Sequence, residues 1–172
     1  MNMYVLFVLG KSEHRIKEYI NSKTLFEAIV PVKVKLLRRK GEVIREEVLL
    51  FPNYVFVRCD LDPPCFRAYV QRYFSNLNGF IKLLQYKDKD IESLSQEEIG
   101  LLKPFFTNRG VFDPSIGFIQ HDRVFITEGP LKGLESSIKH INRHKKEAIL
   151  ELTLFNEVKE VKVSCEILSK LT

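Results

Sequence analysis

The stretch FPNYVFVR, residues 51–58, decides the fold of the first half of the chain. Its proline opens an extended segment, and the aromatic and β-branched residues that follow strongly favour a strand. Because side chains alternate between the two faces of a strand, Tyr54 and Phe56 are predicted to share one face, and Val55 and Val57 the other. Two interpretations are open: both rings belong to a core, or they form an exposed aromatic patch suited to a partner helix.

On the N-terminal side, residues 3–9, MYVLFVL, form an apolar run of strand length that Gly10 ends. Ser12 is predicted to cap a short helix whose apolar stripe consists of Ile16, Tyr19 and Ile20. Residues 30–50 predict a β-hairpin, with a tip at residues 39–42. Gly41 can take the positive φ that such a tip requires.

On the C-terminal side, Pro63 and Pro64 open a helical stretch that reaches Tyr73, and residues 80–84, FIKLL, predict a strand. Ser95 and Glu98 have the spacing of a capping box, which predicts a helix from about Gln96 to Lys103. The resulting order β-α-β-β-α-β-α predicts an α+β domain, a mixed or antiparallel sheet flanked by helices.

The tail has a different pattern. Residues 106–117 hold turn formers without a clear period and are interpreted as a linker. Short strands are then predicted at residues 124–126, 138–141, 148–154 and 158–163. Such short strands bury enough surface only in a small closed barrel. The predicted organisation is therefore a domain at 1–105, a linker at 106–117 and an all-β domain at 118–172.

Composition limits the class of protein. Of the 172 residues, 45% are hydrophobic and 28% are charged, which is typical of a globular chain. The net charge of +5 gives a mild bias towards polyanions, which a solvated surface explains equally well. Three cysteines form an odd set that favours a reducing compartment. Since no apolar run approaches the roughly 20 residues that span a bilayer, we expect a soluble, cytoplasmic monomer with no membrane partner.

Motifs for catalysis or metal binding are not found. His140 and His144 are four residues apart but fall in a predicted strand and turn, and Cys59 and Cys65 have no second pair at zinc spacing. The sequence has no phosphate-binding Walker loop, nucleophile elbow or dinucleotide fingerprint. We therefore expect no enzyme, no catalytic residue, no metal and no cofactor.

A basic cluster lies in the tail. From Lys132 to Lys146 there are five Lys or Arg residues and a single acid, Glu135. The functional interpretation is a patch that follows the phosphates of structured RNA, and the alternative is an ordinary solvated loop. The cluster comprises Lys132, Lys139, His140, Arg143, His144, Lys145 and Lys146.

Residues 51–58 resemble the signature strand of the N-terminal domain of NusG-type transcription elongation factors, and they are especially similar to the form in the specialised paralogue RfaH. The N-terminal Tyr-Val strand, the basic short helix, the charged hairpin and the Leu-Ser-x-x-Glu helix follow the order of that family. The resemblance implies a hydrophobic depression that binds the clamp helices of the largest RNA polymerase subunit. By position, Tyr54 and Phe56 are the first candidates for this contact, and Phe51 and Pro52 support it.

Residues 122–133, DRVFITEGPLKG, together with the run 141–148 and the strand that ends at Leu154 and Phe155, resemble a KOW module, a small β-barrel. The two resemblances cover nearly the whole chain in the family's order. They imply a transcription antitermination factor, most like the paralogue LoaP, which binds a hairpin of the nascent leader RNA through its KOW domain. The family also implies a weaker contact with non-template DNA, by the basic first helix, through Lys11, His14, Arg15 and Lys17.

The sequence departs from the family pattern at several positions. His121 and Ser136 stand where glycine is usual, and Phe155-Asn156-Glu157 replaces the usual Phe-Gly-Arg. In general NusG proteins this last loop docks ribosomal protein S10 or the termination factor Rho, so Glu157 puts both partnerships in doubt. Two alternatives stay open: a housekeeping factor that couples polymerase to S10 or Rho, and a ribosome-associated RNA-binding protein. A helical tail like that of RfaH is disfavoured by the β-branched content after Val158.

Overall fold

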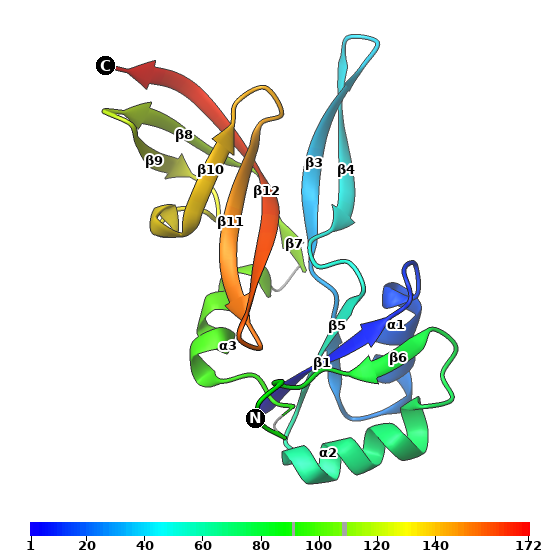
Figure 1. Ribbon diagram of the computed structural model, residues 1–172. Helices are drawn as coiled ribbons and strands as arrows, with labels where there is room; N and C mark the ends of the chain where they lie inside the picture. The colour runs from blue at the N-terminus through cyan, green and yellow to red at the C-terminus, as the bar shows by residue number, and fades with distance from the viewer. Residues whose placement is uncertain (91, 108–109) are drawn as a thin grey trace. The chain divides into compact units, whose positions relative to one another are not determined.

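The computed structural model describes residues 1–90, 92–107 and 110–172 (Figure 1). Its contacts group the chain into two compact units, each built from separate segments. Unit 1 consists of Met1–Val30, Phe51–Lys103 and Leu154–Glu157, and unit 2 of Pro31–Leu50, Pro104–Thr153 and Val158–Thr172. The predicted division at 1–105, 106–117 and 118–172 stays a prediction, since this grouping follows contacts in space.

Unit 1 contains a four-stranded sheet of order β2-β5-β1-β6. Strand β1 (Asn2–Val8) lies at its centre and pairs antiparallel with β5 (Tyr54–Cys59) and with β6 (Phe80–Leu83). Strand β2 (Glu27–Ile29) pairs antiparallel with the other edge of β5. The strands predicted from the apolar run, the FPNYVFVR stretch and FIKLL are thereby confirmed, and β2 is an addition.

One face of this sheet forms the main core of unit 1. Tyr4 on β1 stacks on Phe66 with 3.9 Å between ring centroids, and both rings are buried. Phe66 belongs to α2 (Pro63–Tyr69), which continues as a π-helical turn, η1 (Val70–Phe74). The other helix on this sheet is α1 (Glu13–Lys23), which buries Ile16 and Ile20 but leaves Tyr19 38% exposed. The predicted stripe is thus confirmed for the two isoleucines.

The two predicted helix caps have opposite outcomes. The capping box of α3 (Gln96–Leu102) is confirmed: Ser95 Oγ accepts the Glu98 N–H at 3.2 Å, and the Glu98 carboxylate accepts the Ser95 N–H at 2.9 Å. The helix ends in a 3-10 turn, η2 (Lys103–Phe105). The predicted Ser12 cap is wrong. The backbone of Ser12 is already helical, with φ −96° and ψ −9°, and its side chain makes no capping bond but accepts from Arg15.

Unit 2 contains the predicted hairpin, which is confirmed. Strands β3 (Val32–Arg39) and β4 (Glu42–Leu49) pair from Val32 opposite Leu49 to Arg39 opposite Glu42. At the tip, Lys40 has φ 50° and Gly41 has φ 84°. Two positive φ values in a two-residue loop match the twist of the flanking strands. A short strand, β7 (Val111–Phe112), pairs in parallel with β3.

The remaining strands form a five-stranded sheet of order β10-β11-β12-β8-β9. The four predicted tail strands are confirmed, and the apolar face of β11 is buried as the alternation requires. Their closure into a KOW barrel stays a prediction. The strands are β8 (Ser115–Gln120), β9 (Arg123–Glu128), β10 (Ile138–Asn142), which follows a 3-10 turn, η3 (Glu135–Ser137), β11 (Glu147–Leu154) and β12 (Glu157–Leu171).

Residues 106–117, interpreted as a linker, are partly regular structure. They contain β7 and the first residues of β8, while residues 108 and 109 lie outside the described part of the chain. Both strands were missed because each pairs in parallel with a partner distant in sequence, β3 or β12. Within the described residues, no helix has the length and apolar character that crossing a bilayer demands.

Candidate functional site

The turn before β5 is held by a buried carboxylate. Glu13, 1% exposed on α1, accepts the Asn53 N–H at 2.8 Å. Asn53 has a positive φ of 69°, and its side-chain amide donates to the Val8 carbonyl at 3.0 Å. The backbone N–H of Val8 donates back to the Asn53 carbonyl at 2.9 Å. These bonds fix the direction in which Tyr54 leaves the turn. Sequence reasoning missed Glu13, whose signal is an acid in the first turn of a basic helix.

The aromatic cluster of unit 1 comprises Phe7, Phe51, Tyr54 and Phe56. The expectation that Phe56 is exposed is wrong, because this ring is 0% exposed. Phe56 lies opposite Val5 on the central strand β1, and the ring of Phe51, itself 6% exposed, packs edge-on against it at 5.3 Å. An interior position in the sheet and a second ring beside it together account for the burial.

Tyr54 differs from Phe56 because it begins the strand. Its ring is half-buried and meets the half-buried ring of Phe7 edge-on at 6.0 Å between centroids. The two residues lie directly opposite each other in the antiparallel register of β1 and β5. Pro52, two residues before Tyr54, is exposed. The open part of the aromatic cluster is therefore Tyr54 with Phe7, and the predicted patch is partly core.

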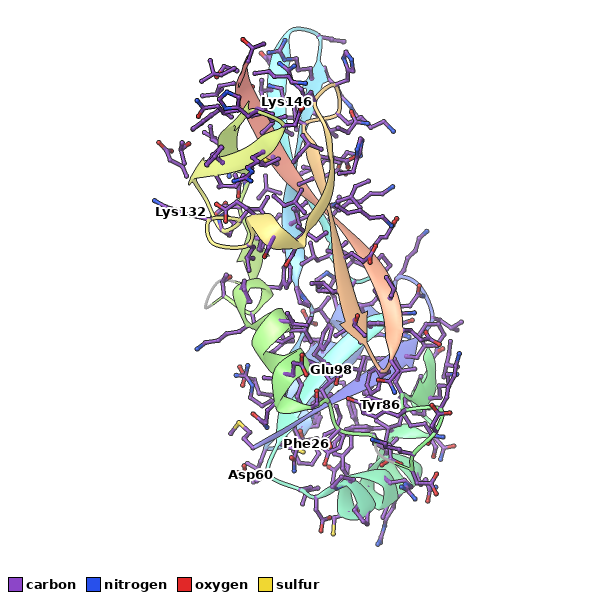
Figure 2. The ribbon with its side chains drawn as sticks, turned by 60° about the vertical axis from the view of Figure 1, so that its left-hand side comes forward. Phe26, Asp60, Tyr86, Glu98, Lys132 and Lys146 are labelled. Atoms are coloured by element: carbon purple, nitrogen blue, oxygen red, sulfur yellow. The ribbon has the colours of Figure 1, made fainter. Side chains whose placement is uncertain are left out.

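A second buried carboxylate lies at the start of α3 (Figure 2). Glu98 is 7% exposed and, besides the Ser95 N–H, accepts the Tyr86 hydroxyl and, at 2.6 Å, the Phe155 N–H. The ring of Phe155 meets that of Tyr86 at 5.2 Å. Burial, and next the hydrogen bond to Glu98, raises the pKa of the Tyr86 phenol. The Phe155-Asn156-Glu157 loop is thus anchored in unit 1, and Glu157 forms an ion pair with Lys87 at 2.6 Å.

The predicted basic cluster of the tail is divided in space. Lys139 pairs with Glu151 at 2.8 Å and Glu160 at 3.1 Å, and these two carboxylates raise the pKa of its ammonium group. Lys132 follows β9 and lies well apart from Lys146, as Figure 2 shows. His140, Arg143, His144 and Lys145 are exposed. The cluster therefore does not form one continuous patch.

The basic residues near the first helix are likewise not equivalent. Lys11 and His14 are exposed and Lys17 is half-buried. The Arg15 guanidinium donates to the Asn78 carbonyl at 2.7 Å and to Ser12 Oγ at 3.4 Å. Arg15 therefore has a structural task, fastening α1 to the turn before β6.

In unit 2, the structure brings part of the tail cluster together with residues of the hairpin. They line an open groove of about 750 Å³. We call it the basic groove. Its cationic residues are Lys33, Lys35, Arg38, Lys145, Lys146 and Lys162, with His144 beside them and Glu147 as the single acid. Sequence reasoning missed Lys33, Lys35 and Lys162, because their signal is only a Lys at alternate positions of a strand.

Among the residues that the structure describes, the side chains that could bind a metal are dispersed. In residues 1–90, 92–107 and 110–172, no three His, Cys, Asp or Glu side chains converge to bind a cation. All three cysteines are free thiols, with Cys59 and Cys165 buried and Cys65 exposed.

Comparison with known proteins places the chain in a family. The sequence model of the family described as "Transcription termination factor nusG" matches residues 1–103, more than half of the chain. Two relatives come from strains of Helicobacter pylori, and both are named "Transcription termination/antitermination protein NusG". The protein of strain J99 is 23% identical over 172 residues, covering 95% of this chain and 94% of its own length. That of strain 26695 is 24% identical over 164 residues, covering 90% of each.

NusG proteins are transcription factors rather than enzymes, and they generally bind RNA polymerase. The match begins at the first residue and ends with the helix α3, so it includes the aromatic cluster and both buried carboxylates. The chain belongs to the NusG family of transcription termination and antitermination factors.

Proposed function

We propose that this protein is a specialised NusG paralogue, similar to LoaP and RfaH, that binds RNA polymerase and suppresses pausing and termination. The observation that carries the proposal is the half-exposed ring of Tyr54, which a fixed turn presents beside Phe7. Aromatic side chains supply a large share of the binding energy at protein interfaces when they enter an apolar pocket. The expected contact is with the clamp helices of the largest polymerase subunit.

The other members of the aromatic cluster have supporting roles in this proposal. Phe51 and Phe56 are buried, so they shape the floor on which Tyr54 and Phe7 rest and are not themselves the first contacts. Pro52 is exposed and extends the apolar rim. No bond is made or broken: the factor shifts the population of polymerase towards the elongating state by binding that state more tightly.

Retention of purified RNA polymerase on the immobilised full-length protein tests the contact. Tyr54→Ala is expected to weaken retention by at least about 30-fold, which corresponds to the loss of about 2 kcal/mol at a hot spot. Tyr73→Ala is the matched control, because it removes a 49% exposed tyrosine from the same unit outside the cluster. Equal retention of the two variants would disprove the proposed contact.

The C-terminal residues 118–172 are proposed to form the KOW domain and to bind a hairpin of the nascent RNA. Support comes from the basic side chains of the 143–146 turn, which are mostly exposed. A weaker contact with non-template DNA is proposed for Lys11, His14 and Lys17, whereas Arg15 is occupied by Asn78.

A housekeeping role is the second candidate, and the relatives favour it, since both are named NusG and match over at least 90% of their length. It requires the Phe155-Asn156-Glu157 loop to dock S10 or Rho. Against this, Phe155 is 7% exposed, its N–H is bonded to Glu98, and Glu157 is paired with Lys87. Binding of the full-length protein to purified S10 or Rho at micromolar concentration would favour the housekeeping role over the specialised one.

A further inference from the structure

The basic groove carries more positive charge than the carboxylates around it neutralise. Six of its thirteen lining residues are Lys or Arg, and Glu147 is the single acid. Lys146 is paired with Glu166 at 2.5 Å. Within the described part of the chain, Lys35, Arg38, Lys145 and Lys162 have no carboxylate within ion-pair distance. Elsewhere in unit 2 the pattern differs, as the paired Lys139 and Lys170 show.

The two walls of the groove come from distant parts of the sequence, and hydrogen bonds hold them together. Lys33 on β3 donates through Nζ to the carbonyl of Lys162 on β12. Ser164, also on β12, donates through Oγ to the Val34 carbonyl at 2.5 Å. Within the wall that the tail forms, the Cys165 N–H donates to the Lys146 carbonyl at 2.8 Å. These hydrogen bonds hold the two walls in one arrangement, so the groove does not depend on flexible lysine side chains alone.

The pKa of Lys33 is lowered in this arrangement. Burial lowers the pKa of its ammonium group, Glu147 acts in the opposite direction, and the charges of Lys35 and Lys162 lower it further. A bound anion would remove the repulsion among these groups. Apolar side chains, among them Leu37, Val43 and Val48, line the same groove and offer surface for the flat faces of sugars or bases.

We propose that the basic groove binds the sugar–phosphate backbone of an RNA strand, with Lys35, Lys145 and Lys162 as phosphate contacts. The inference deepens the proposed RNA binding and rests on it. It assigns the contact to a composite surface to which the β3–β4 hairpin contributes as much as the tail, and it places Lys132 and Lys139 outside the contact. Three phosphate-binding lysines on two walls are suited to a backbone that runs along the groove.

Fluorescence anisotropy with the full-length protein tests this assignment, using a labelled single-stranded RNA of mixed sequence and DNA of the same sequence. Reversing one lysine on each wall, K35E with K145E, is expected to weaken binding about tenfold or more at physiological salt. The dependence of log affinity on log salt should become shallower by about 1.4, which is about 0.7 for each phosphate of a single strand that is no longer neutralised. The RNA is expected to bind more tightly than the DNA, and tighter binding of the DNA would overturn the assignment of the groove to RNA.

The matched control is R123E with K132E, which changes the net charge equally in the same unit but outside the groove, at exposed residues. Its affinity is expected to stay within about threefold of the original protein, because long-range charge is largely screened. If this control loses as much affinity as the groove variant, the groove is overturned while RNA binding by the tail stands. If the original protein binds neither strand, the groove is overturned, whereas binding of a folded RNA hairpin and polymerase retention are tested separately. The milder K162Q, expected to lose about fourfold, decides the matter if the double variant unfolds.

Discussion

Unit 1, which carries the aromatic cluster, and the basic groove of unit 2 place their buried ionisable groups in opposite surroundings. In the unit that holds the aromatic cluster, the buried carboxylate of Glu13 receives a backbone N–H, and that of Glu98 receives three donors. In the basic groove, the partly buried ammonium of Lys33 faces two like charges. The two carboxylates have hydrogen-bond donors without a ligand, so they hold the surrounding surface in one shape. The groove leaves a repulsion that an anion would relieve.

The largest effect that this contrast predicts is on stability. Glu98→Ala leaves the Phe155 and Ser95 amides and the Tyr86 hydroxyl without their acceptor. We expect the free energy of unfolding in urea to fall by about 3 kcal/mol, because each stranded buried donor costs about 1–3 kcal/mol and some regain water. Glu97→Ala, an exposed neighbour on the same helix, should change it by less than about 0.5 kcal/mol. A small loss for Glu98→Ala would show that its carboxylate is not a structural centre.

A smaller effect is expected at Glu13, and it tests whether the fixed turn matters for binding. Glu13→Ala should lower the free energy of unfolding by about 2 kcal/mol and weaken polymerase retention, because the Asn53 N–H loses its acceptor and Tyr54 its fixed direction. Glu13→Gln keeps an oxygen at the same place and should restore most of the retention. Unchanged polymerase retention in a folded Glu13→Ala protein would separate the turn from the contact.

The smallest predicted effect on the free energy of unfolding is an increase and not a decrease. Lys33→Met removes the partly buried charge together with the bond to the Lys162 carbonyl. Because the relief of the buried charge offsets the lost bond, the free energy of unfolding at neutral pH should stay equal or rise by at most about 1 kcal/mol, while nucleic acid affinity falls. The lowered pKa of Lys33 means that the unfolded chain holds more protons just below the ordinary value of 10.5. The stability of the original protein relative to Lys33→Met should therefore rise as pH increases through that window. Urea unfolding of both proteins at several pH values checks the slope, and a falling difference would contradict it.

Local patterns explain what the sequence predicted correctly. The capping box of Ser95 and Glu98, the Gly41 turn and the alternation along β11 are each decided within about ten residues. The Ser12 cap failed although its residue type was right. Its hydroxyl accepts from Arg15 and lies where Gly79 comes so close that a Cβ there would be 2.4 Å from it. That approach joins segments far apart in the sequence.

The candidate site likewise depends on contacts between residues distant in sequence, which local patterns do not predict. Alternation correctly placed Tyr54 and Phe56 on one face of β5, but it does not tell which end of that face is covered, and Phe51 covers Phe56. Likewise, Lys145 was named from a local cluster of charge. Its association with Lys35 depends on β3 meeting β12 through side-chain hydrogen bonds, a long-range contact that a single sequence does not reveal.

The three bonds of Glu98 have a further consequence for motion within unit 1. One carboxylate serves both as the clasp of the first turn of α3 and as the anchor of the Phe155 amide. Fraying of the helix start and detachment of the loop should then be a single event, with the same opening free energy for the Ser95 and Phe155 amide protons. Hydrogen exchange should therefore give the same opening free energy at these two amides, although they are distant in the chain.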